Sequence, residues 1–368
     1  MRITVTAPGL DGGIARNVLN LVHAWTALGV DVDIVLDHGG GPYVEQIGEQ
    51  ARVFVSGGSN AFSKVPWMAR YLRRAQPAGV LTPVPRHTVL VLRARRLSRV
   101  SCRVVATVHN NYSVTVRSLS EKKRRSRLKT ISAHYPACDA IVAVSRGATD
   151  AFAAVTGIPR ERLTTIYNPV VTDSLREQAR ATVQHPWFTR GGGVPVVVNV
   201  GRLVGQKNQD LLISAFERIR AYREVRLAII GEGEERLALE ARIAGSRYSE
   251  DIQLLGHRPN PYALVSRANA FALSSSWEGF GNVLVEAMAL GVPVVSTDCP
   301  SGPHEILEGG RWGPLVPVCN ADALAAGIVA CLDEPLTPQV LMDAAARFEV
   351  AMIARQYLEV LLGEEAGI

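Results

Sequence analysis

Two stretches of the sequence combine residue types that could bind a phosphate-linked sugar. In EGFGNVLVE, Glu278 precedes a Gly-Phe-Gly turn, and Glu286 follows eight residues later in an apolar, helix-like run. In NVGRLVGQKN, Arg202 and Lys207 follow a strand on a glycine-containing loop. Carboxylates accept hydrogen bonds from sugar hydroxyls, and cations stabilise the negative charge that grows on a departing diphosphate. Together these residues predict chemistry at a sugar diphosphate.

The residues after Glu278 predict how an anion would be held. The strand AFAL precedes this loop, and a helix with an apolar face is predicted from Asn282 onward. Its start, from Gly281 to Leu284, is expected to offer unpaired backbone N–H groups to an anion. Glu286 lies four residues after Asn282 and therefore on the same helix face. The plainer alternatives are a helix-surface Glu286, a capping Glu278 and a solvated loop around the two cations.

Short Val- and Ile-rich runs that alternate with amphipathic segments predict the elements that carry these loops. This rhythm is typical of parallel sheets with crossover helices, and it occurs in both halves of the chain. The predicted strands are RITVTA, VDVDIVL, ARVFV, AGVL, RVVATV and AIVAV in the first half, then VPVVVNV, VRLAII, IQLLG, NAFAL and VPVVST in the second.

Glycine turns follow several of these strands. Gly12 and Gly13 are predicted to begin a helix that runs to Leu28, and Gly231 with Gly233 is predicted to open another. Ligands of open parallel sheets bind beyond the carboxyl ends of the strands, where such turns and helix N-termini meet. Neither glycine segment matches G-x-G-x-x-G, so the glycines give little support to a nicotinamide enzyme.

The strand and helix rhythm breaks between residues 168 and 195, where Pro, Gly and scattered charges replace it. We therefore predict two Rossmann-like domains. The amphipathic tail has no strand after it and could pack back on the first domain. The predicted parts are an N-terminal domain at 1–170, a linker at 171–193, a C-terminal domain at 194–347 and a tail helix at 348–368.

The composition is that of a globular enzyme, with 47% hydrophobic and 20% charged residues. No apolar stretch approaches the roughly 20 residues needed to span a bilayer. The first residues lack the apolar core of a secretory signal, so we expect a cytoplasmic protein. The five cysteines are widely spaced and form no C-x-x-C pair, which favours reduced structural thiols.

The segments GRLVGQKN, EGFGNVLVE and GVPVVSTDCPSGPHEIL, taken together, resemble the retaining, nucleotide-sugar-dependent glycosyltransferases of family 4 and group 1. The resemblance covers the whole chain. It implies an α/β protein of the GT-B fold, with two Rossmann-like domains facing across a cleft. It also implies transfer of a hexose or N-acetylhexosamine from a UDP-sugar to a lipid-linked or other anionic glycan acceptor in cell-envelope polysaccharide or glycolipid synthesis. The alternatives are a UDP-sugar epimerase of the same fold and a GDP-mannose-dependent mannosyltransferase.

The same resemblance implies a role for each matching residue. Arg202 and Lys207 would bind the donor diphosphate. Glu286 would bind the ribose hydroxyls, and Glu278 the donor hexose. Catalysis would then be a front-face substitution, in which the departing phosphate takes the acceptor's proton. The other implied positions are the amides of Phe280, Gly281 and Asn282 at the sugar and diphosphate, Gly12 and Gly13 in a loop over the phosphates, His257 beside the nucleobase, and His109 facing the anomeric centre.

No metal or other cofactor is expected, because the two cations can neutralise the diphosphate. The sequence DVD at Asp31 and Asp33 superficially resembles the metal-binding D-x-D of a different glycosyltransferase fold. Strand alternation puts both aspartates on one face of a strand in the first domain, away from the cations. We therefore interpret them as structural.

Positive charge is concentrated in the first domain. Between Lys64 and Lys129 the chain has 17 lysines and arginines and one acidic residue, Glu121. A solvated face is one interpretation. Nucleic-acid binding is disfavoured, because few aromatic residues are interleaved and no nucleic-acid motif accompanies the run. We predict instead a peripheral association with the anionic inner face of the cell membrane, where each cation near the surface contributes about 1 kcal/mol.

Overall fold

The computed structural model describes residues 1–368 except 11, 40–42, 48–49, 57–60, 189–192 and 364–368. The chain divides into two compact units, one comprising residues 1–170 and 350–368 and the other residues 171–349. Much of the predicted linker at 171–193 therefore belongs to the second unit, where helix α8 (Asp173–Ala179) packs on α11 (Tyr262–Val265). Residues 189–192 of that segment, and 364–368 of the tail, lie outside the described residues.

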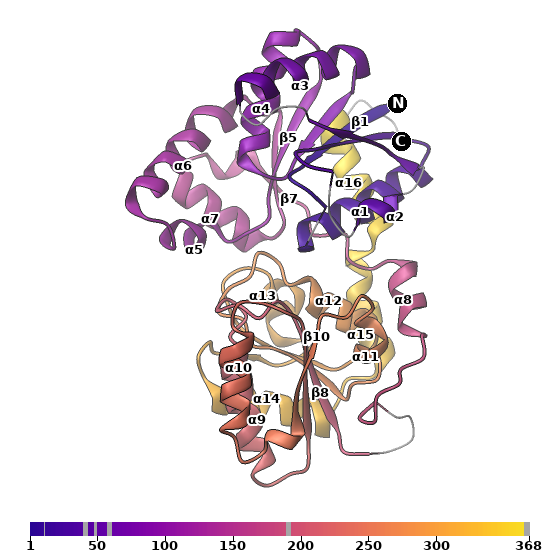
Figure 1. Cartoon of the computed structure of the whole chain (residues 1–368), viewed down its shortest axis with the longest axis vertical. Coiled ribbons are helices and arrows are strands. Elements are labelled where there is room, and N and C mark those ends of the chain that lie inside the picture. The colour runs from indigo at the N-terminus through magenta and orange to yellow at the C-terminus, as the bar shows by residue number, and fades with distance from the viewer. Residues whose placement is uncertain (11, 40–42, 48–49, 57–60, 189–192, 364–368) are drawn as a thin grey trace. The chain divides into compact units, whose positions relative to one another are not determined.

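The first unit is built on a parallel sheet flanked by helices on both faces (Figure 1). Its described strands, in sheet order, are β3 (Arg52–Val55), β2 (Asp31–Leu36), β1 (Arg2–Ala7), β4 (Gly79–Thr82), β5 (Arg103–Val108), β6 (Ala140–Ala143) and β7 (Leu163–Thr165). Its described helices are α1 (Gly12–Ala27), α2 (Val44–Ile47), α3 (Ala61–Ala75), α4 (Pro85–Ser98), α5 (Tyr112–Arg117), α6 (Glu121–His134), α7 (Arg146–Thr156) and α16 (Val350–Leu362), with short 3-10 turns at Tyr135–Ala137 and Arg160–Arg162.

The alternation of strand side chains divides this unit into two cores. On β2, Ile34 packs with α1 and α16, whereas the next residue, Val35, packs with α3 and α4 on the other face. Helix α1 begins at Gly12, as predicted, and its apolar stripe is buried as far as Trp25. Leu28 is 40% exposed because the helix ends one residue before it.

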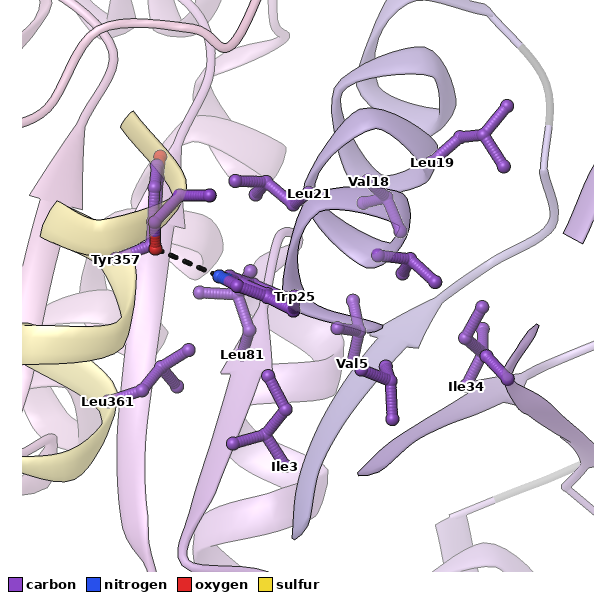
Figure 2. Close-up of a cluster of buried hydrophobic side chains, with 14 of the residues drawn as sticks. Ile3, Val5, Val18, Leu19, Leu21, Trp25, Ile34, Leu81, Tyr357 and Leu361 are labelled. Carbon is purple, nitrogen blue, oxygen red and sulfur yellow. Dashed lines mark hydrogen bonds between the residues drawn. The ribbon is translucent and has the colours of Figure 1, made fainter. Parts of the chain in front are cut away.

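The tail helix α16 packs against α1 in the first unit (Figure 2). Tyr357 and Leu361 of α16 are buried in the same core as Leu21 and Trp25 of α1. The dashed line in Figure 2 marks the bond that the Trp25 indole Nε1 donates to the carbonyl oxygen of Ala354, at 2.9 Å. This bond satisfies the one polar atom of a fully buried tryptophan, which fixes where the tail docks.

The second unit is also built on a parallel sheet. Its described strands, in sheet order, are β10 (Ile252–Gly256), β9 (Arg226–Ile230), β8 (Val196–Val200), β11 (Ala270–Leu273), β12 (Val294–Thr297) and β13 (Leu315–Val316). Its described helices, besides α8 and α11, are α9 (Gln209–Arg220), α10 (Arg236–Ala244), α12 (Asn282–Ala289), α13 (Pro303–Ile306), α14 (Ala321–Asp333) and α15 (Pro338–Ala345), with 3-10 turns at Ser249–Asp251, Glu308–Gly310 and Ala346–Phe348.

The order of this second sheet decides which loops meet. Strands β8 and β11 are neighbours, although β9 and β10 lie between them in the sequence. The loops that leave the carboxyl ends of β8 and β11 are therefore adjacent. They carry the two cations and the first glutamate singled out in the sequence.

Candidate active site

The loop after β8 is tied to the loop after β11 by hydrogen bonds to its backbone. The Ser274 hydroxyl donates to the carbonyl of Lys207 at 2.8 Å, and the Ser276 amide donates to the carbonyl of Gln206 at 2.8 Å. The Gln206 side chain donates in return to the carbonyl of Trp277 at 2.9 Å. These bonds hold the two loops in one rigid edge.

Lys207 and Glu278 form an ion pair across these two loops. The Nζ of Lys207 lies 2.5 Å from Oε1 of Glu278, and the side chains are 15% and 7% exposed. The Ser275 hydroxyl donates to the same Oε1 at 2.7 Å, and the Glu278 amide donates to the carbonyl of Pro300 at 3.1 Å. A cation and a carboxylate that sequence analysis assigned to different parts of a donor thus contact each other directly.

Arg202 lies on the same loop as Lys207 but in a different environment. Its side chain is exposed, and its guanidinium has no hydrogen-bond or ion-pair partner among the described residues. The Gln209 side chain donates to the carbonyl of Arg202 at 3.0 Å and so holds its backbone. The guanidinium is therefore available to an anionic ligand.

Helix α12 places the second glutamate. The helix begins at Asn282 as predicted, after Gly281 at φ 106°, a left-handed conformation that favours glycine. The prediction of unpaired N–H groups from Gly281 to Leu284 is wrong at Leu284, because its amide donates to the carbonyl of Gly281 at 3.0 Å. Glu286 is partly buried and accepts a bond from the Tyr262 hydroxyl at 3.1 Å.

Tyr262 was missed by sequence analysis. It is buried at the start of α11, in the segment NPYAL, and no periodicity or charge marks it as a site residue. Its only signal is a position just before the strand that leads to Glu278. Only the packing of α11 against α12 brings its hydroxyl to Glu286.

Several glycines allow these loops to approach one another. A Cβ on Gly302, which has φ 92°, would lie 1.7 Å from the carbonyl oxygen of Phe280. A Cβ on Gly231 would lie 1.8 Å from the carbonyl oxygen of Gly201. The prediction that Gly231 and Gly233 open a helix was wrong, since α10 begins only at Arg236. Close backbone contact with the loop after β8 is the reason for glycine here.

His257 follows β10, at the far side of the same sheet edge. It comes directly after Gly256, which has φ 73°, and its side chain is exposed. The order β10-β9-β8-β11 separates it from the Lys207–Glu278 pair by one strand, β9. The backbone at Gly256 accepts a bond from the amide of Gly231 at 2.9 Å, which joins this loop to the next.

In the first unit, His109 lies directly after β5. Its Nε2 is 2.8 Å from the Thr107 hydroxyl, and its buried Nδ1 has no partner among the described residues. Burial lowers the pKa of His109 to about 4, so the imidazole is neutral at physiological pH. A neutral imidazole with an unused ring nitrogen can still accept or donate one hydrogen bond.

His109 lines a cavity of about 930 Å³ within the first unit. Tyr112 contributes apolar wall, and exposed Lys122, Lys123 and Arg127 of α6 contribute positive charge. The cavity is therefore lined both by a neutral histidine and by the exposed cations of α6. Its volume lies within the range of about 300–1,000 Å³ that is usual for small-molecule sites.

The predicted glycine loop lies near this cavity. Helix α1 begins at Gly12, which has φ 69°, and Ile14 in its first turn lines the cavity. A Cβ on Gly12 or Gly13 would meet no other atom within 4 Å. Both positions are exposed, so space for an approaching ligand remains beside them.

Asp33 of the DVD segment is structural, as interpreted from the sequence, whereas Asp31 is exposed at the start of β2, 3.6 Å from Arg2. Asp33 is completely buried and accepts two bonds from Arg52, at 2.8 and 3.0 Å, and one from the Tyr71 hydroxyl at 2.7 Å. No group of three or more His, Cys, Asp or Glu residues that could hold a metal occurs in the described parts of the chain. Nor is any described helix long and apolar enough to cross a bilayer.

Two family models match the chain in succession. The model "Glycosyltransferase Family 4" matches residues 11–174, and "Glycosyl transferases group 1" matches residues 185–348. Together they span both structural units.

Relatives and solved structures agree with these family matches. One relative is a Campylobacter jejuni N-acetylgalactosamine-N,N'-diacetylbacillosaminyl-diphospho-undecaprenol 4-alpha-N-acetylgalactosaminyltransferase, 32% identical over 63% of this chain and 62% of that protein. The chain thus aligns with less than two thirds of this relative. The Rhizobium meliloti lipopolysaccharide core biosynthesis glycosyltransferase LpsE is 26% identical over 89% of this chain and 88% of its own length. The structure of Anabaena HepE with UDP-glucose has a TM-score of 0.78 at 22% identity, over 98% of this chain and 99% of HepE.

Proposed function

The chain belongs to the glycosyltransferases with the GT-B fold, and we propose that it transfers a hexose or N-acetylhexosamine from a UDP-linked donor to a glycan acceptor. The observation that carries the proposal is the buried Lys207–Glu278 pair, with Arg202 unpaired on the same loop in the described structure. The preference for UDP is supported by the UDP-glucose bound to HepE.

The proposed donor site uses the charges of the loop after β8. Arg202 and Lys207 bind the diphosphate and stabilise the charge that develops on it as the glycosidic bond breaks. The Lys207 ammonium has three N–H donors, of which Glu278 takes one, so others remain for a phosphate oxygen. The bond to Glu278 keeps the ammonium oriented before the donor binds. No metal ion is part of the proposal.

The carboxylates hold the donor in position. Glu286 accepts hydrogen bonds from the ribose hydroxyls, while the Tyr262 hydroxyl donates a hydrogen bond to its Oε1. Glu278 binds a hydroxyl of the hexose, the backbone of residues 280–282 approaches the sugar and diphosphate, and His257 lies beside the nucleobase. This arrangement lowers the barrier mainly through positioning.

We propose that the anomeric configuration is retained by front-face substitution. A double displacement would need a free carboxylate at the anomeric carbon, whereas Oε1 of Glu278 already accepts bonds from Lys207 and Ser275. In the proposed step the acceptor oxygen bonds to the anomeric carbon as the bond from that carbon to the phosphate oxygen breaks. The acceptor proton passes to the departing phosphate.

The test of the donor site is a thermal-shift panel of UDP-, GDP- and ADP-sugars, followed by product analysis with the nucleotide sugar that raises the melting temperature. Glu286→Gln keeps the shape but weakens charge-assisted bonds, so its affinity for UDP should fall by about ten-fold or more. Tyr262→Phe, which removes only the supporting bond, should have a smaller effect. Unchanged affinity in Glu286→Gln would contradict the assignment, and an epimerised UDP-sugar would indicate an epimerase instead.

We further propose that the acceptor is anionic or lipid-linked, that the cavity of the first unit binds it, and that the enzyme acts at the inner face of the cell membrane. The support is the exposed basic helix α6, in which Glu121 is the one acidic residue and pairs with Arg124 at 2.8 Å. The relative that acts on a diphospho-undecaprenol substrate is consistent with such an acceptor.

Liposome co-sedimentation tests the membrane proposal. Binding should require anionic lipid, fall as salt screens the exposed charges and weaken in Lys122→Ser/Lys123→Ser. The variant Arg180→Ser/Arg355→Ser removes two exposed cations outside α6 and serves as the matched control. Equal binding to neutral liposomes, or equal losses in both variants, would contradict a specific role for α6.

A further inference from the structure

We propose that a second cavity of the first unit, separate from the transferase machinery, binds a phosphorylated saccharide. The cavity measures about 340 Å³ and is lined by four arginines and three aromatic residues, which we call the arginine pocket. Its members used below are Arg2, Arg52, Arg70, Arg74, Trp67 and Tyr71. The inference goes beyond the proposed function, because nothing in the transfer reaction needs this pocket.

The arginine pocket lies at the end of the sheet opposite to His109. Arg2 and Arg52 are the first residues of strands β1 and β3, whereas His109 follows the last residue of β5 in the same parallel sheet. Arg74, at the end of α3, is also part of the lining. A ligand here would therefore be remote from the loops that leave the carboxyl ends of the strands.

The pocket has more positive charge than its own residues neutralise. Buried Asp33 accepts two hydrogen bonds from Arg52, so the negative charge of Asp33 neutralises the positive charge of Arg52. The Arg2 Nε is buried without a hydrogen-bond partner in the described chain, at 3.9 Å from Asp33. Arg70 and Arg74 are exposed and have no ion-pair or hydrogen-bond partner among the described residues.

A buried N–H without an acceptor is costly, and native proteins pair most such groups with protein, water or a ligand. Guanidinium groups match phosphate oxygens through paired hydrogen bonds. Arg70 and Arg74 are four residues apart on α3, so they lie on one face of that helix. The exposed guanidiniums of Arg70 and Arg74, without a partner in the described structure, therefore fit a phosphate group, and the Nε of Arg2, 3.9 Å from Asp33, has no hydrogen bond among the described residues.

The aromatic residues supply a second recognition element. The rings of Trp67 and Tyr71 are stacked, with centroids 5.8 Å apart and an angle of 4° between their planes. The Tyr71 hydroxyl is anchored by Asp33 at 2.7 Å and by Thr4 at 2.8 Å. Trp67 remains partly exposed at the pocket. A rigid indole beside arginines offers an apolar face to the C–H groups of a sugar ring while the phosphate binds the cations.

A saccharide phosphate fits these features better than a lipid bilayer does. Lipid headgroups are attracted by exposed cations on a surface, whereas Arg70 and Arg74 line a cavity together with the aromatic side chains of Trp67 and Tyr71. The volume of about 340 Å³ lies at the small end of ligand sites, as expected for a monosaccharide phosphate.

The experiment is calorimetric titration of the full-length protein with glucose 6-phosphate, glucose and inorganic phosphate, with UDP present so that phosphate sites for the donor are occupied. We expect glucose 6-phosphate to bind at least about ten-fold more tightly than either other probe. In Arg70→Ser/Arg74→Ser its affinity should fall by about ten-fold or more. The variant Arg93→Ser/Arg96→Ser, which removes two exposed arginines from neighbouring helix α4, should bind as the wild type does.

Trp67→Phe gives a second readout, because glucose 6-phosphate should change the tryptophan fluorescence of the wild type and not of this variant. Equal affinity for inorganic phosphate and glucose 6-phosphate would overturn the saccharide assignment. So would loss of anionic-liposome binding in Arg70→Ser/Arg74→Ser together with no binding of glucose 6-phosphate, which would indicate a membrane contact. Because these measurements do not use turnover, they can fail or succeed independently of the proposed transfer reaction.

Discussion

The buried pair of Lys207 and Glu278 allows a quantitative test of how the candidate donor site is held together. We consider Lys207→Met and Glu278→Gln, which remove one charge each while keeping the approximate shape. Each single change leaves a buried charge without the partner that lies 2.5 Å away in the wild type. Breaking a buried pair in this way costs about 3 kcal/mol.

The double variant should be much less affected than the sum of its parts. With both charges gone, no buried ion remains uncompensated at this pair, and Ser275 still donates to the side-chain oxygen at residue 278. Replacing both partners is often nearly neutral, so we expect a cost below about 1.5 kcal/mol instead of about 6. The difference is a coupling free energy of about 4.5 kcal/mol or more, above the roughly 0.5–3 kcal/mol usual for residues in contact, because both charges are buried.

Scanning calorimetry of the four full-length proteins at neutral pH and physiological salt measures this coupling. For a unit of this size 1 kcal/mol corresponds to about 2–4 °C, so each single change should lower the melting temperature by about 6–12 °C. The double variant should lose less than about 6 °C. The comparison between variants matters more than any absolute value, because the chain has two units.

The matched control is the pair Arg236–Glu232, which has the same nitrogen–oxygen distance of 2.5 Å but side chains that are 35% and 48% exposed. The double-mutant cycle of this control pair should give a coupling free energy below about 0.5 kcal/mol, as for exposed pairs four residues apart. Additive losses at Lys207 and Glu278, or a coupling no larger than the control, would refute the view that burial makes this pair strong.

Three further predictions concern other residues of the site. Arg202→Ala should change the free energy of unfolding by less than about 0.5 kcal/mol, because the side chain is exposed and unpaired in the described structure. Its turnover should fall by about 10²-fold or more. Near-normal turnover would show that Arg202 does not belong to the diphosphate site. His109 should make the wild type lose stability as pH falls, since the unfolded residue binds a proton near the ordinary histidine pKa of 6.5 and the folded one only at about 4. The loss approaches about 3 kcal/mol, and a melting-temperature profile against pH should be flatter for His109→Asn. Gly302→Ala places a Cβ 1.7 Å from the carbonyl of Phe280 at φ 92° and should cost at least about 3 kcal/mol in urea unfolding, whereas Gly12→Ala, with open space around it, should cost about 1–2.

Much of the fold could be predicted from local sequence patterns. The Val- and Ile-rich runs marked the longer strands, and the switch to helical spacing marked the starts of α1 at Gly12 and α12 at Asn282. Strands β7 and β13 were not predicted. They have three and two residues, too few for a pattern, and exist because β6 and β12 offer them partners.

The candidate site was predictable in its residue types and not in its contacts. Glycine-flanked loops carrying Arg202, Lys207 and Glu278 could be recognised along the sequence. The ion pair between Lys207 and Glu278 could not, because the two residues are 71 positions apart and meet only where β8 and β11 are neighbours. The bond from Tyr262 to Glu286 likewise depends on the packing of one helix on another.

The class of protein, two parallel α/β units, and the chemistry of the loops follow from local patterns, because strand period, helix spacing and loop composition are local properties. Which charges neutralise each other depends on how the elements pack. Within the described residues the tertiary structure pairs Lys207 with Glu278 and leaves Arg202 open, and it encloses Asp33 between Arg52 and Tyr71 while Arg70 and Arg74 stay unpaired. The physical reason is that a charge is paired by whatever burial brings within a few ångströms, and strand order and helix packing set those distances across long separations in the chain.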